Sequence, residues 1–500
     1  MQKFKLNHTV ISFLPIVVFI PITYQLINDF HLGGLELFID FVKSAVTPKV
    51  NKEIINISLT RLNETIIISF ISWIISIIFG TIFGILTSDI FYKLIRIPIF
   101  VKYLLKFILN IIRSIHELVW CLILIQIFGI DTWIGILAIC IPFIAINAKV
   151  ISEQLEMISV ETIESITSLN GDNLSSLVTL VWSPTINIIK NFGLYRLECS
   201  IRSTAILGFF GIGGIGTSIF LSFQALNFNE MWTYLYFISF LILFSKQILQ
   251  QFKLKRLNLN FSILIIFVSL IITFFSFCFL IYLLVNNYYP SNFLFSKTLF
   301  LNFFNLPENF LKSIFDTIIL SVFASAIAIS IPPILLLISQ NKYFIITLRL
   351  IAFIFRVIPP TIIILVLLVF NQPSLSLASI TLGFYNAGIT FKLLNDNLSE
   401  IDRNNFIAFK SIGISNRSSW LIGLFIKQSK SYLSYCAYRS DIIIRETTIV
   451  SIVGSLGLGW QLKESLSSFA WNEVFIIVLS YSSIAIIGEL INDKIKSKLI

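Results

Sequence analysis

Long apolar runs dominate this chain of 500 residues and constrain its fold more than any other feature. A helix needs about 20 apolar residues to cross the ~30 Å hydrocarbon layer of a membrane. The composition agrees with such a fold, because 56% of the residues are hydrophobic and only 12% are charged. We therefore predict an all-α polytopic membrane protein with about 12 transmembrane helices. The runs lie near residues 9–27, 62–87, 105–128, 132–152, 195–222, 231–248, 259–286, 311–337, 345–371, 375–395, 436–462 and 473–491.

The two halves of the chain repeat one motif. Each residue of the second copy follows its counterpart by 243 residues, without a gap. The copies are Tyr195, Arg196, Glu198, Arg202, Gly211, Gly214 and Gly216, and then Tyr438, Arg439, Asp441, Arg445, Gly454, Gly457 and Gly459. With about six spans in each half, both repeats enter the membrane in the same direction and are parallel. We predict a first repeat at residues 1–253 and a second at residues 254–500.

The net charge of +10 lies in short stretches between the apolar runs. These stretches hold Lys93, Arg96, Lys102, Lys106, Lys246, Lys253, Lys255, Arg256, Lys494, Lys496 and Lys498. Basic loops stay on the cytoplasmic side of a membrane, which places both termini and the central linker in the cytoplasm. The basic balance therefore reports topology, and we predict no nucleic-acid partner.

One loop in each half is too long to be a simple connector. These loops, near residues 153–190 and 396–432, mix polar and apolar residues at helical spacing and predict short amphipathic helices. They resemble the Glu-Ala-Ala coupling loop of ABC-importer permeases, which docks on the ATPase subunits. The residues that this resemblance makes candidates for ATPase coupling are Glu161, Glu164, Gly171, Pro184, Ala408 and Gly413. The second loop departs from the pattern, with Ile407 in place of the glutamate.

Two further stretches resemble the permeases of phosphonate ABC importers. Arg113-Ser114-Ile115-His116-Glu117-Leu118-Val119-Trp120 is similar to their Arg-Ser-Ile-Pro-Glu-Leu-Val-Trp, with a histidine replacing the proline. The Tyr-Arg-X-Glu, Ile-Arg and Gly-rich order after residue 195 is similar as well. The resemblance implies two fused permease units of the type I ABC-importer (MetI-like) fold in a bacterial inner membrane. It implies two ATP-binding cassette ATPase subunits, a periplasmic substrate-binding protein, and phosphonate, phosphite or phosphate as cargo.

Charged residues lie inside the apolar runs, where each costs roughly 2.5 to 3.5 kcal/mol on insertion scales and usually faces a protein interior or an aqueous path. Glu198 and Arg202 are four residues apart and share a helix face, as do Asp441 and Arg445. An arginine suits the oxygens of a phosphonate. The candidates for the substrate pathway are Arg113, Glu117, Arg196, Glu198, Arg202, Arg356, Arg439, Asp441 and Arg445. The alternative is that each acid–arginine pair is a structural, self-neutralising contact between helices.

The repeated glycines have two interpretations. A Gly-rich turn can bind phosphate, but small residues also allow close helix packing or mark a gate, which we favour for Gly211, Gly214, Gly216, Gly454, Gly457 and Gly459. No Gly-Lys-Ser/Thr sequence follows them, and we find no nucleotide-binding loop in the chain. We expect a permease without an ATPase site, a metal site or a cofactor of its own. His116 beside Glu117 leaves a proton relay as a lesser alternative.

Another cargo and another class of transporter remain open at this point. Fused double permeases also serve ferric iron and thiamine importers. An ion-coupled secondary transporter would use Glu198 or Asp441 as its proton site. A membrane enzyme is disfavoured, because the sequence contains no metal, nucleophile–base or cofactor constellation.

Overall fold

The computed structural model describes residues 9–95, 98–158, 161–162, 165, 180, 185, 192–254, 306–338, 341–369, 371–402 and 404–499. The chain divides into two compact units. Phe41–Ser296 forms the first-half unit, and Met1–Asp40 with Lys297–Ile500 forms the second-half unit. Each is described by itself below.

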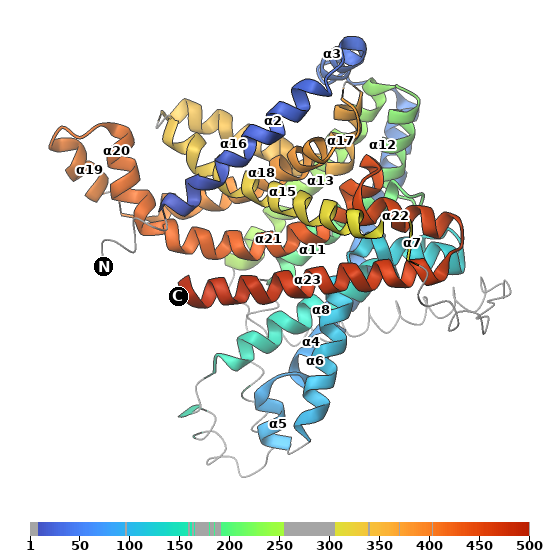
Figure 1. Ribbon diagram of the computed structural model, residues 1–500, viewed down its shortest axis with the longest axis horizontal. Coiled ribbons are helices and arrows are strands. Elements are labelled where there is room, and N and C mark those ends of the chain that lie inside the picture. The colour runs from blue at the N-terminus through green and yellow to red at the C-terminus, as the bar shows by residue number, and fades with distance from the viewer. Residues whose placement is uncertain are drawn as a thin grey trace. The chain divides into compact units, whose positions relative to one another are not determined.

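The first-half unit consists of helices joined by short turns in its described residues. Its helices are α4 (Lys52–Leu86), α5 (Asp89–Ile95), α6 (Ile99–Ser114), α7 (Glu117–Phe128), α8 (Thr132–Glu156), α11 (Leu194–Gly208), α12 (Ile215–Gln224) and α13 (Phe228–Leu254). The long helices α4 and α8 pack along each other, with α6 beside α8 (Figure 1).

The second-half unit repeats this order of helices. They are α15 (Phe310–Ile338), α16 (Lys342–Val357), α17 (Pro360–Leu368), α18 (Leu375–Glu400), α19 (Asn404–Ser411), α20 (Asn416–Trp420), α21 (Ile426–Gly454), α22 (Gly457–Ser467) and α23 (Trp471–Leu499). A single π-helical turn, Leu421–Phe425, joins α20 to α21. Here α15 packs along α18, as α4 does along α8. The helices α6, α7, α8 and α13 begin 243 residues before α16, α17, α18 and α23.

A hydrogen bond joins the paired long helices at the same place in each unit. Asn147 on α8 donates through Nδ2 to the carbonyl oxygen of Ser76 at 3.0 Å. Thr390 on α18 donates through Oγ1 to the carbonyl oxygen of Ala328 at 2.8 Å. Thr390 follows Asn147 by 243 residues and Ala328 follows Ser76 by 252, because the segment that contains α5 lengthens the first half. The duplication is therefore visible in buried polar contacts as well as in sequence.

Apolar length makes the chain a multi-pass membrane protein. Within the described residues, six helices are long and apolar enough to cross a membrane, or up to nine spans if each bent pair is one. The apolar run at 259–286 lies outside the described residues, so the expected twelve spans stay a prediction.

Two spans expected to be continuous are sharply bent in the structure. The axes of α6 and α7 differ by 87°, and those of α16 and α17 by 91°. Ile115 ends α6 with extended backbone angles, and His116 then begins α7 by accepting a hydrogen bond from the Leu118 N–H at 3.1 Å. Pro359 holds the matching place before α17, where its ring opposes a continuing helix. The hydropathy pattern missed both breaks because the flanking residues are apolar on either side.

The N-terminal segment packs on the second-half unit. Besides the short 3₁₀ turns Leu14–Val18 and Leu32–Gly34, it contains α2 (Phe19–Asn28) and the start of α3 (Leu35–Ser44). Ser376 on α18 donates to the side chain of Gln25 at 2.6 Å, and the rings of Phe13 and Phe425 meet edge to face at 5.6 Å. Compactness thus groups residues 9–40 apart from residues 41–254. The repeat boundary at residues 253 and 254 stays a prediction about sequence duplication.

Candidate functional site

The predicted acid–arginine pair of the first half is formed on α11. Arg202 donates through Nη2 to Oε1 of Glu198, one helical turn away. The two side chains retain only 16% and 13% of their exposure. Burial in low dielectric strengthens this ion pair but also removes both groups from water, so the contact is compatible with either proposed role.

The second half forms the same pair on α21. Arg445 donates through Nη2 to Oδ2 of Asp441 at 2.6 Å. Their side chains are 10% and 9% exposed. The shorter aspartate reaches its partner as the glutamate does in the first half, so this spacing is maintained despite the change of acid.

Arg196 lies two residues before Glu198 on α11 and is 7% exposed. Its guanidinium carbon lies 3.7 Å from the centre of the Phe143 ring on α8, so one face of the guanidinium is stacked on an aromatic ring. Among the described residues, none offers a hydrogen-bond acceptor to its Nε or Nη2. Arg196 is therefore a buried cation with part of its donor edge unused.

A carboxylate lies near this cation but is bound elsewhere. Glu117, the first residue of α7, accepts a hydrogen bond from the hydroxyl of Ser203 on α11 at 2.6 Å. The imidazole Nε2 of His116 lies 3.4 Å from the other carboxylate oxygen. Glu117 also interacts electrostatically with Arg196. The sequence placed Glu117 beside His116 only, and the structure also connects it to Ser203 on α11.

Arg439, the counterpart of Arg196, is enclosed by hydrogen bonds. Its Nε donates to Oδ1 of Asn386 on α18, and its Nη2 donates to Oε1 of Glu446 at 2.9 Å. Asn386 in turn donates through Nδ2 to Oε2 of Glu446 at 2.9 Å. The three side chains form a closed polar triangle near the middle of α21, and Arg439 is 5% exposed.

Sequence reasoning missed four residues of these two sites: Phe143, Ser203, Asn386 and Glu446. Asn386 follows Phe143 by 243 residues, and Glu446 follows Ser203 by the same number. Aligning the halves at this offset beyond the repeated motif would have exposed both exchanges. Glu446 also carried a signal of its own, as a carboxylate within an apolar run directly after Arg445.

Arg113 and Arg356 occupy matching places in the last turns of α6 and α16, just before the bends. They are 6% and 7% exposed. Arg113 contacts Asn110 on its own helix, with 3.4 Å between Nη2 and Oδ1. A cation at this end of a helix also interacts favourably with the helix dipole.

The Gly214 turn is held by side chains of α4. Gly214 has φ +78°, which only glycine adopts easily, and its N–H donates to Oε2 of Glu64 at 2.8 Å. The next N–H, of Ile215, donates to Oγ1 of Thr65 at 2.9 Å. These N–H groups already have protein acceptors, which disfavours the alternative that the turn binds phosphate.

The second half repeats part of this turn. Gly457 has φ +61°, and the following N–H of Leu458 donates to Oγ1 of Thr317 at 3.0 Å. Thr317 follows Thr65 by 252 residues, the offset already seen for the first long helix. Gly211, by contrast, has φ +89° and space around its Cα, so its backbone conformation alone requires glycine.

Gly216 allows α12 to approach α11 closely. A Cβ at this position would overlap the carbonyl oxygen of Ala205. At the matching Gly459, a Cβ would lie 2.6 Å from Cβ of Ser451. A Cβ on Gly454 would lie 2.8 Å from the end of the Ile364 side chain. Small residues at such contacts let helices pack closely in membranes.

The predicted coupling loop of the second half, near residues 396–432, contains the two short helices α19 and α20. No residue of α19 is buried, and Ala408 lies on its exposed surface. Gly413 ends this helix in the left-handed region at φ +89°. Ile407 and Ile412 are 59% and 76% exposed.

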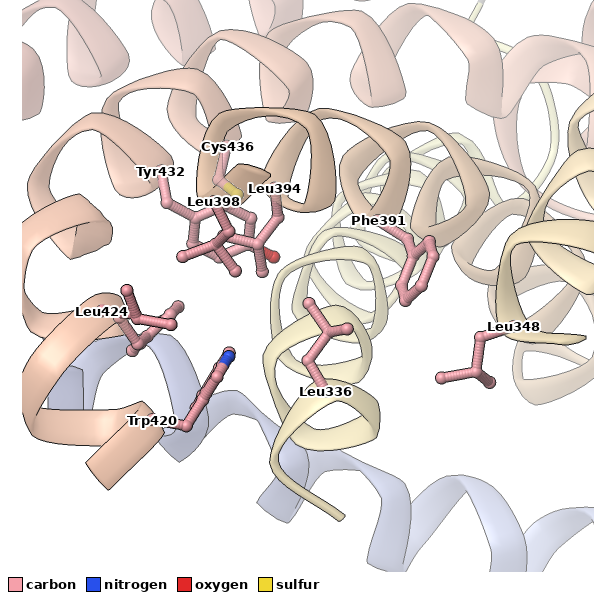
Figure 2. Packing of buried hydrophobic residues seen from close by; sticks show 10 residues of the cluster. Leu336, Leu348, Phe391, Leu394, Leu398, Trp420, Leu424, Tyr432 and Cys436 are labelled. Atoms are coloured by element: carbon pink, nitrogen blue, oxygen red, sulfur yellow. The ribbon is translucent and has the colours of Figure 1, made fainter. Parts of the chain in front are cut away.

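One end of this loop is fixed to the helix bundle. Figure 2 shows Trp420 of α20 directed into a group of buried side chains. Trp420 is 3% exposed and stacks on Phe425 with 5.2 Å between ring centres. The group consists of Leu336, Leu348, Phe391, Leu394, Leu398, Trp420, Leu424, Phe425, Tyr432 and Cys436. Movement of α20 would therefore be transmitted to α15, α18 and α21.

The first-half coupling loop is described only in part. Glu161 is exposed. Glu164, Gly171 and Pro184 lie outside the described residues. Their predicted role in ATPase coupling stays a prediction.

No protein-family model matches the chain. The chain is similar to phosphate-import and phosphite-transport permeases. It is 22% identical over 421 residues to the phosphate-import permease protein PhnE of Mycolicibacterium smegmatis, covering 79% of this chain and 77% of that protein. It is 25% identical over 121 residues to the putative phosphite transport system permease protein HtxE of Stutzerimonas stutzeri, covering 24% of this chain and 46% of that one.

A third relative carries the name of a phosphonate transporter. Over 94 residues the chain is 27% identical to the putative cryptic phosphonate transport system permease protein PhnE2 of Escherichia coli, covering 19% of this chain and 77% of that protein. The alignment with the M. smegmatis protein is long enough to require both halves of this chain, whereas the other two match shorter stretches.

Proposed function

We propose that this chain is the permease subunit of a binding-protein-dependent ABC importer that moves phosphonate, phosphite or phosphate into the cytoplasm. The observation that carries the proposal is an alignment with a phosphate-import permease that covers 79% of this chain. The shorter matches to phosphite and phosphonate permeases favour the same cargo class over ferric iron or thiamine.

The proposed architecture is two fused units of the type I importer fold, with six spans each and parallel orientation. The matching helix starts and the repeated hydrogen bond from α8 or α18 support it. The protein lies in a bacterial inner membrane with both termini in the cytoplasm. Its energy comes from two separate ATPase subunits, and a periplasmic binding protein delivers the cargo.

The translocation path runs beside α11 and α21, because these helices carry the buried charges. An anion that leaves water needs fixed positive groups along its way, and arginine binds phosphorus oxyanions through two parallel hydrogen bonds. We assign the path to Arg113, Glu117, Arg196, Glu198 and Arg202, with Arg356, Arg439, Asp441 and Arg445 in the second half.

The ATPase subunits dock on the two coupling loops. In the second half, the exposed isoleucines of α19 and its C-terminal end offer an apolar surface to such a partner. Trp420 connects that surface to the bundle, so closure of the ATPase pair on ATP would move α20 and the helices packed on it.

Transport in proteoliposomes tests this function. The vesicles contain the chain, its ATPase and its binding protein, and uptake of labelled phosphonate is measured with phosphite, phosphate, thiamine and ferric ion as competitors. We expect ATP-dependent uptake that only phosphorus oxyanions inhibit. Uptake driven by an ion gradient without ATP, or inhibited by thiamine or ferric ion, would contradict the proposal.

A further inference from the structure

The two arginines at matching places in the repeats differ in their hydrogen bonding. Arg196 and Arg439 are both buried, at 7% and 5% exposure. Arg439 donates to two side chains, whereas Nε and Nη2 of Arg196 have no acceptor among the described residues. Buried polar groups are nearly always hydrogen-bonded, and leaving one unbonded is unfavourable, more so when it is charged.

Three exchanges between the halves produce this difference. Where the second half has Asn386, which accepts from its arginine, the first half has Phe143, which can only stack. Where the second half has Glu446, the first half has Ser203. The first-half carboxylate comes instead from Glu117, whose counterpart is Pro360.

Each arginine therefore has a carboxylate nearby, but the carboxylate belongs to a different helix in each half. In the second half it reaches the guanidinium from the same helix as Arg439. In the first half it comes from α7 and is hydrogen-bonded to Ser203, so it interacts with Arg196 electrostatically without occupying its Nε and Nη2 donors. Phe143 fixes the plane of the guanidinium, and stacking leaves its edge available.

We propose that the unoccupied edge of Arg196 is where the phosphorus oxyanion binds during passage, and that Arg439, although on the proposed path, is closed to the anion by Asn386 and Glu446. The inference rests on the proposed function. Two parallel N–H groups of a guanidinium match two oxygens of a phosphonate or phosphate. An oxyanion that retains a P–OH group can also donate to Glu117, which removes the repulsion expected from a neighbouring carboxylate.

A carboxylate near the arginine suits a site that binds the anion briefly and then releases it. A transport site must bind its cargo well enough to admit it and weakly enough to release it. A lone buried arginine would hold an anion strongly, whereas Glu117 moderates that attraction. Of the two matched arginines, Arg196 then serves as the anion site and Arg439 does not.

The decisive variant closes Arg196 without removing it. E117Q/F143N/S203E moves the carboxylate to α11 and adds the amide, which reproduces the second-half arrangement at an unchanged formal charge. In proteoliposomes with ATPase and binding protein, we expect phosphonate uptake to fall at least tenfold while the complex still assembles. Wild-type uptake by the assembled triple variant would overturn the inference.

A second variant keeps the inference testable if the triple variant does not assemble. R196K preserves the charge but lacks the forked donors, and we expect a loss of at least tenfold. R61Q is the matched control, because Arg61 contributes a half-exposed pair with Glu64, and uptake should stay within twofold of wild type. Wild-type uptake by R196K would also overturn the inference. If the wild-type complex takes up no phosphorus oxyanion, the proposed function itself fails.

Discussion

At the scale of single residues, the position of a carboxylate decides what an arginine is able to do. Glu446 and Asn386 complete the hydrogen bonds of Arg439. In the first half, the carboxylate of Glu117 accepts a hydrogen bond from Ser203 instead. Both arrangements neutralise a buried cation. Only the first-half arrangement leaves guanidinium donors for another molecule.

The closed triangle of the second half predicts a stability effect. R439Q leaves Glu446 buried without its counter-charge, and breaking a buried ion pair from one side costs about 3–5 kcal/mol. We expect a lower melting temperature in detergent for R439Q than for wild type. The double variant R439Q/E446Q removes both charges and should recover much of the loss. Equal melting temperatures for the single variant and wild type would argue that the triangle contributes no stability.

The Glu198–Arg202 pair gives a prediction about transport. We expect R202A to abolish phosphonate uptake while membrane insertion and ATPase binding persist, because a path-lining cation is lost but the helix remains. The measurements are uptake in proteoliposomes and co-purification with the ATPase. Loss of the assembled complex would instead assign the pair a structural role.

At the scale of elements, bends and close contacts shape each unit. The breaks before α7 and α17 and the turn at Gly214 depend on a few residues at helix ends. Sequence periodicity located the helices, but it did not locate the breaks. Each break depends on one residue, the capping His116 or Pro359, and the sequence on both sides of it remains apolar.

The close contact between α11 and α12 predicts that a side chain at Gly216 is not tolerated. G216A would place a methyl group against the carbonyl oxygen of Ala205, and overpacking of this kind typically costs about 1–3 kcal/mol. We expect a reduced melting temperature in detergent. G33A is the control, since a Cβ there meets only ordinary contact at 3.8 Å. Equal effects of the two changes would contradict a specific role for the α11–α12 contact.

At the scale of the whole molecule, the two halves share one plan and differ in detail. The first half contains α5, and the described residues of the second half include no matching helix. The coupling loops differ as well, with Glu164 in one and Ile407 in the other. A fused chain can specialise each copy, because a change in one half is not forced on the other.

Unequal loops predict unequal contacts with the ATPase subunits. We expect G171D and G413D to reduce uptake by different factors, since the aspartate meets a different loop sequence in each half. For G413D, backbone strain at φ +89° adds to the effect. ATP hydrolysis and uptake measured side by side separate loss of coupling from loss of assembly. Identical factors for the two variants would count against specialised loops.

The sequence by itself determined that the chain enters a membrane many times and that its halves are copies. Hydrophobic length and a constant offset are properties of the chain order, so no coordinates were needed to read them. It also placed Arg196 and Arg439 in equivalent positions. Only the tertiary structure decided that one is closed and the other is not. Arg439 is closed by Asn386 of α18 together with Glu446 of its own helix, whereas Phe143 of α8 and Glu117 of α7 are near Arg196. Hydrogen bonding depends on which side chains meet in space, and residue spacing along one helix does not contain that information.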